Sequence, residues 1–77
     1  MDKDKILAQA QIISDKLNDQ AKSKGFHIMA IKELGIDKCY QLASLSLQKQ
    51  HSGQIKVTAA RYYNGCVMQE LAKRKEN

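Results

Sequence analysis

The sequence predicts an all-α fold, a small compact bundle of about four helices in which residues 1–77 form a single helical domain. Apolar residues recur at spacings of three and four, which is typical of amphipathic helices. There is no proline, and Gly25, Gly35 and Gly53 fall where the periodic segments end. No alternating, β-branched run is long enough for a strand. Because so short a chain has a thin core, we also expect a homodimer or a larger homo-oligomer.

The first helix is expected from about Asp4 to Lys24. Its apolar residues follow one another at spacings of four, three and four, which gives a narrow stripe of the coiled-coil type. Such a stripe packs either on the rest of the domain or on the same helix of a second copy. The residues of this stripe, which are the dimerisation candidates, are Ile6, Ala10, Ile13 and Leu17.

The second helix is expected over about His27–Leu34 and is closed by Gly35. Asp37 is a good N-cap for a third helix that runs to about Gln50. This third helix has a broad apolar face and is expected to be the most buried element; that face comprises Ile36, Cys39, Tyr40, Leu42, Ala43, Leu45 and Leu47. Its polar side comprises Lys38, Gln41, Ser44 and Gln48.

The last helix is expected to begin between Gln54 and Thr58 and to end near Lys73. Residues 73–77 are expected to form a frayed basic tail. Gly65 lies inside this helix, where glycine costs about 1 kcal/mol relative to alanine. It indicates either a close helix–helix crossing or a break. The expected inner face is Ala59, Tyr63, Cys66 or Val67, and Leu71.

The segment from Ile31 to Lys38 resembles the middle of a helix-turn-helix unit. In that unit a first helix ends at a turn that often contains glycine, and a second helix enters the major groove of DNA. The resemblance implies that Leu34 and Ile36 hold the two helices together. An ordinary helix–glycine–helix corner is the alternative, and Gln41 stands where the motif has an apolar residue. On the polar side of the third helix, the candidates for reading base edges are Lys38, Gln41 and Ser44.

The net charge of +5 and the pI near 9.4 are typical of a chain that binds nucleic acid or an acidic protein surface. Much of the excess lies in Lys73-Arg74-Lys75. Solvated surface charge is the alternative explanation for each cation. The candidates for phosphate contacts are Lys32, Lys49, Lys56 and Arg61.

Two functions therefore stay open. The first is a small basic, non-catalytic protein of helix-turn-helix-like type that binds double-stranded DNA, as an accessory or regulator of processes such as transcription. The second is a helical protein–protein interaction module, such as an adaptor, an inhibitor or a chaperone-like dimer, that does not bind nucleic acid. The charge and the corner at Gly35 favour the first; the apolar third helix favours the second.

Other chemistry has little support in the sequence. Cys39, Cys66, His27 and His51 lack zinc-site spacings, so we expect no metal, and both histidines are expected to be exposed. No catalytic motif is present, and we expect no cofactor and no small-molecule substrate. Arg61-Tyr62-Tyr63 could stack on bases, although helical spacing favours Tyr63 in the core. No signal peptide or membrane span is evident, which predicts a soluble cytoplasmic protein with reduced thiols.

Overall fold

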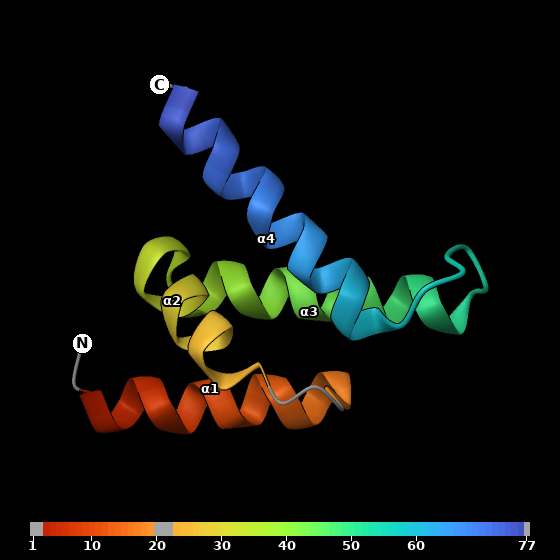
Figure 1. Cartoon of the computed structure of the whole chain (residues 1–77). Coiled ribbons are helices and arrows are strands. Elements are labelled where there is room, and N and C mark those ends of the chain that lie inside the picture. The colour runs from red at the N-terminus through yellow and green to blue at the C-terminus, as the bar shows by residue number, and fades with distance from the viewer. Residues whose placement is uncertain (1–2, 20–22, 77) are drawn as a thin grey trace.

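The computed structural model describes residues 3–19 and 23–76, and these residues form helices without any strand. The helices are α1 (Lys3–Leu17), α2 (Lys24–Leu34), α3 (Ile36–His51) and α4 (Ala59–Glu76). In Figure 1, α1 lies alongside α3, α2 lies at the end where α3 begins, and α4 crosses α3 obliquely and extends away from it. The predicted all-α bundle is confirmed. Within the described ranges, no helix has the length and apolar character needed to cross a membrane.

The core is formed by one side of each helix, with α3 in contact with the other three. The predicted stripe of α1 belongs to this core, because Ile6, Ala10, Ile13 and Leu17 are all buried within the single chain. These side chains pack on their own domain and are not accessible to a second copy. The dimer contact that was expected through this stripe is therefore replaced by an intramolecular one. On α3 the apolar face that packs on the core is narrower than predicted, since Leu45 is 39% exposed.

The first helix is shorter than predicted and ends at Leu17. Asn18 has a φ of 53°, in the left-handed region. The Asn18 amide donates to the Asp15 carbonyl oxygen at 3.1 Å, and the Asp19 amide donates to the Ser14 carbonyl oxygen at 3.0 Å. This pair of bonds is a Schellman motif, in which asparagine takes the place that glycine usually has. Gly25 was expected to end this helix, but it lies in the first turn of α2.

The corner between α2 and α3 consists of Gly35 alone. Its φ of 89° and ψ of 156° lie in a region that essentially only glycine occupies. Gly35 is also the N-cap of α3, and no side chain caps that helix. Asp37 was expected as the N-cap and lies in the first turn instead. A helix-turn-helix unit has a turn of about three or four residues, so this corner is tighter than the motif.

The last helix starts at Ala59 and is capped by Thr58, whose Oγ1 accepts a hydrogen bond from the Arg61 amide at 3.2 Å. It continues through Lys73–Lys75 to Glu76, so residues expected in a frayed tail are helical. Gly65 neither breaks α4 nor permits a close crossing. It is exposed, and a Cβ built on it would meet nothing within 4 Å.

Candidate nucleic-acid-binding face

The side of α3 that faces away from the core is open to solvent. Gln41, Ser44 and Gln48 are exposed there and follow one another at spacings of three and four, so they share one line along the helix. They line a shallow, open depression together with Asp37, Tyr40 and Leu45. Their side chains make no hydrogen bond to other residues in the described part of the chain. We call this surface, Gln41, Ser44 and Gln48 with the adjoining Lys49, the open face of α3.

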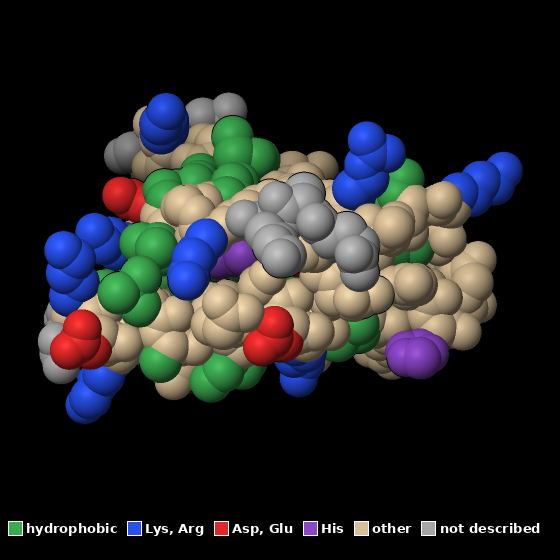
Figure 2. Space-filling model, turned by 60° about the horizontal axis from the view of Figure 1, so that its bottom comes forward, with side chains coloured by type: hydrophobic (Ala, Val, Ile, Leu, Met, Phe, Trp, Pro, Cys, Tyr) green, Lys and Arg blue, Asp and Glu red, His purple; other side chains and the backbone are tan. Residues whose placement is uncertain are grey.

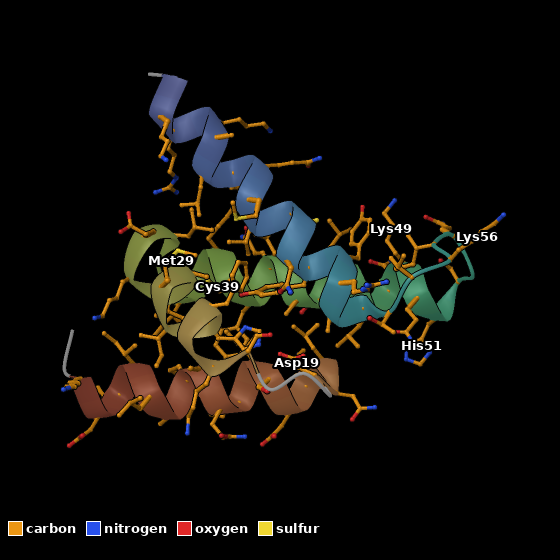
Figure 3. The ribbon with its side chains drawn as sticks, viewed as in Figure 1. Asp19, Met29, Cys39, Lys49, His51 and Lys56 are labelled. Carbon is orange, nitrogen blue, oxygen red and sulfur yellow. The ribbon has the colours of Figure 1, made fainter. Side chains whose placement is uncertain are left out.

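The open face continues past the end of α3 into the loop that leads to α4. A second small hollow begins at Leu45 and Gln48 and extends to Lys49, Ser52 and Gln54. The Lys49 ammonium donates to the Gln54 side-chain oxygen at 3.1 Å, a neutral partner that leaves its positive charge in place. Figure 3 shows Lys49 and Lys56 at this same end of the molecule. The structure therefore brings together Gln41, Ser44 and Lys49, with Lys56 close to the end of the face.

Lys38 takes part in an ion pair that the sequence did not predict. Its ammonium lies 3.2 Å from a carboxylate oxygen of Glu70 on α4, and the two side chains are 34% and 22% exposed. The pair neutralises the Lys38 charge and links the beginning of α3 to the middle of α4. Lys38 therefore contributes to the contact between α3 and α4.

The other predicted cations lie outside the open face. Lys32 lies on α2, at a hollow that it shares with Lys3, Leu7 and Ile28. Arg61 is exposed in the first turn of α4, which begins beside the end of α3, since the Ala59 amide donates to the Gln50 side-chain oxygen at 2.9 Å. In the basic segment at the end of α4, the Arg74 guanidinium donates to the backbone oxygen of Glu33 at 3.1 Å. Figure 2 shows lysine and arginine side chains spread around the outline of the molecule rather than gathered in one block.

The structure contains a buried polar pair, His27 and Asp19, that was not predicted from the sequence. His27 was expected to be exposed, but it is completely buried, and its Nε2 lies 2.9 Å from Oδ2 of Asp19. The same carboxylate oxygen accepts a hydrogen bond from the Ser23 amide at 3.0 Å. Figure 3 shows Asp19 directed from the end of α1 towards the interior. The pair therefore fixes both ends of the connection between α1 and α2.

Beside this pair, Tyr63 and Cys39 are also fully buried, and the rings of His27 and Tyr63 lie 5.7 Å apart. The prediction that Tyr63 belongs to the core is confirmed. Burial raises the pKa of Tyr63 well above its usual range, and the Cys39 thiol adds to that rise. Burial likewise raises the pKa of the Cys39 thiol. An imidazole beside a carboxylate is a pair that also occurs in catalytic sites, but His27, Tyr63 and Cys39 have no exposed surface, so we assign the cluster a structural role.

Among the described residues, no group of three or more histidine, cysteine or acidic side chains is arranged to hold a metal ion. Cys66 is half-buried, and burial raises the pKa of its thiol. His51 is exposed, as predicted, and Figure 3 shows it on the loop end of α3.

Comparison with known proteins adds no further assignment. No protein-family model, no curated protein and no solved structure matches this chain. The function is therefore inferred from the surfaces of the chain itself.

Proposed function

We propose that this chain is a small non-catalytic DNA-binding protein that places the open face of α3 in the major groove of double-stranded DNA. The observation that carries the proposal is the line of Gln41, Ser44 and Gln48, three exposed hydrogen-bonding side chains without partners among the described residues. This line ends at Lys49, and Lys56 follows in the loop.

The chemistry of these side chains suits base edges. A glutamine amide can donate and accept at once, which matches N6 and N7 of adenine, and a serine hydroxyl suits several bases. From Gln41 to Gln48 the helix rises about 10 Å, the length of roughly three base pairs. A major groove about 12 Å wide admits one helix. Each good base contact is worth about 1–3 kcal/mol of discrimination.

The charges favour an orientation in which the C-terminal end of α3 lies nearest the phosphates. Asp37 at the other end repels phosphate, and Lys38 is neutralised by Glu70. This leaves Lys49, Lys56 and Arg61 for the DNA backbone. Binding through the exposed side of α3 does not require the longer turn of a helix-turn-helix unit.

Three phosphate contacts predict a modest dependence on salt. Each contact contributes about 0.9 to the slope of log affinity against log salt concentration, so the total slope is about −2.7. Between roughly 50 and 200 mM salt, affinity for a random-sequence duplex should fall about 40-fold.

The test is fluorescence anisotropy with a labelled random-sequence duplex over this range of salt. Lys49→Ala and Lys56→Ala should each reduce the slope by about 0.9. Lys5→Ala is the matched control, since Lys5 is an exposed helical lysine in the first half of α1 and lines none of the hollows at the open face or at the end of α3; it should leave the slope unchanged.

Base reading is tested by selecting duplexes from a random pool. The wild-type chain should enrich a short motif, and Gln41→Ala or Gln48→Ala should relax the preference at one position of that motif. No binding at about 50 mM salt, or an equal loss of slope in Lys5→Ala, would contradict the proposal.

A further inference from the structure

A second surface has a different character from the open face of α3. It is a hollow of about 350 Å³ between the first half of α1 and α2, lined by Lys3, Ile6, Leu7, Ile28 and Lys32. Three of these five residues are aliphatic, and Ile6 forms a buried floor. Leu7 is 37% exposed, and Ile28 is half-buried. We call this surface the α1–α2 hollow.

Covering the apolar part of the hollow lowers the free energy of the complex. Removing apolar surface from water contributes about 25 cal/mol per Å². Single exposed apolar residues are ordinary on protein surfaces, but here the aliphatic side chains of two helices lie around one concave site. Its volume is at the low end of the range of about 300–1,000 Å³ for ligand sites. It therefore accommodates a large side chain or two rather than an extended cofactor.

The rim of the hollow is positive. Lys3 and Lys32 are both exposed, and neither forms an ion pair with any residue that the structure describes. Figure 2 shows hydrophobic side chains between lysine and arginine side chains at the left end of the molecule. An occupant that fits both features carries an aliphatic or aromatic group between carboxylates.

We propose that the α1–α2 hollow binds an acidic amphipathic segment of a partner protein, with one or two apolar side chains in the hollow and carboxylates at Lys3 and Lys32. The net charge of +5 attracts an acidic partner over a longer range. A second copy of this chain is a poorer occupant, because it carries the same net charge of +5.

Two other occupants fit less well. DNA places phosphates against a surface, and an aliphatic floor offers them no hydrogen bond. A lipid bilayer takes up apolar side chains that protrude from a protein, whereas this site is concave. This surface is separate from the open face of α3, so the two proposals succeed or fail independently.

The experiment measures fluorescence anisotropy of a labelled synthetic peptide in which two leucines lie between pairs of glutamates. Wild-type protein should bind it saturably. Leu7→Asp should weaken binding by about tenfold through the loss of apolar contact and repulsion of the glutamates. Lys32→Glu should weaken it by about fivefold. Both positions are on the surface, and thermal melting checks that each variant folds.

The chain offers a matched control for each change. Ile12 is 47% exposed on α1 outside the hollow, so Ile12→Asp should bind the peptide as wild type does. Lys16 is in the last turn of α1, as Lys32 is in the last turn of α2. Lys16→Glu therefore reproduces the effect of charge reversal on a helix end without touching the hollow.

Several results would overturn the proposal. One is the absence of saturable peptide binding; another is equal weakening by Ile12→Asp or Lys16→Glu. If a peptide with serines in place of the leucines binds equally well, charge alone accounts for the binding and the apolar part of the hollow does not contribute. If the protein binds vesicles that contain phosphatidylserine but not the peptide, and Leu7→Asp abolishes the vesicle binding, the surface binds lipid instead. DNA binding should be unchanged in Leu7→Asp, and peptide binding should be unchanged in Lys49→Ala.

Discussion

The tight corner at Gly35 leads to a quantitative prediction. With φ at 89° and ψ at 156°, Gly35→Ala forces alanine into a region that costs about 1–3 kcal/mol. A Cβ at this position meets nothing within 4 Å, so the whole loss comes from the backbone and none from a clash. For a chain of this size, whose total stability is about 4–12 kcal/mol, the loss is substantial. Urea denaturation followed by far-ultraviolet circular dichroism measures it.

Gly65→Ala is the matched control, because Gly65 is exposed in the middle of α4 and a Cβ there also meets nothing within 4 Å. In a helix interior this change should stabilise the fold by about 1 kcal/mol. The two variants should therefore differ by about 2–4 kcal/mol, which corresponds to roughly 10–30 °C in Tm. If Gly35→Ala is as stable as the wild type, the conformation assigned to the corner is wrong.

Three further predictions concern the interior and the α3–α4 contact. His27→Ala should destabilise the fold by about 3 kcal/mol, because it removes the buried imidazole that pairs with the Asp19 carboxylate. The exposed His51→Ala should change stability by less than about 0.5 kcal/mol, and the urea midpoints of the two variants measure the difference. The folded chain holds the protons of the Tyr63 phenol and of both thiols more tightly than the unfolded chain, because burial raises their pKa values. The contribution of these groups to the free energy of unfolding should therefore be fully present below about pH 8 and fall above about pH 9, by up to about 1.4 kcal/mol per pH unit for each group. Tyr63→Phe should reduce the loss above about pH 10. An unchanged urea midpoint at high pH would contradict this. A double-mutant cycle with Lys38→Ala and Glu70→Ala should give a coupling of about 0.2–1 kcal/mol, since both side chains are partly exposed.

Local patterns were sufficient to predict most of the fold. The spacing of Ile6, Ala10, Ile13 and Leu17 predicted a buried stripe, and Gly35 predicted the end of α2, since both signals act over one or two helical turns. The end of α1 was missed because residues 18–24 have a composition that helices tolerate. The signal at Asn18 was available, since asparagine is the usual substitute for glycine in the left-handed cap.

The functional surfaces were harder to predict, because they depend on contacts between distant residues. Lys38 was assigned to base reading, and only the packing of α4 on α3 brings Glu70 to it. His27 was expected in water because its partner Asp19 is eight residues earlier and reaches it across a connection. Leu7 and Ile28 lie on separate helices, so no pattern within one helix shows that they share a hollow.

The proposal that α3 binds DNA is tested most directly by an amide NMR titration of isotope-labelled protein with a random-sequence duplex. We expect the resonances that shift to be those of Gln41, Ser44, Gln48 and Lys49 and of the loop before Thr58, while those of Leu7 and Ile28 stay in place. If no resonance shifts at low salt, or if the shifts gather around the α1–α2 hollow, the open face of α3 is not a DNA-binding surface.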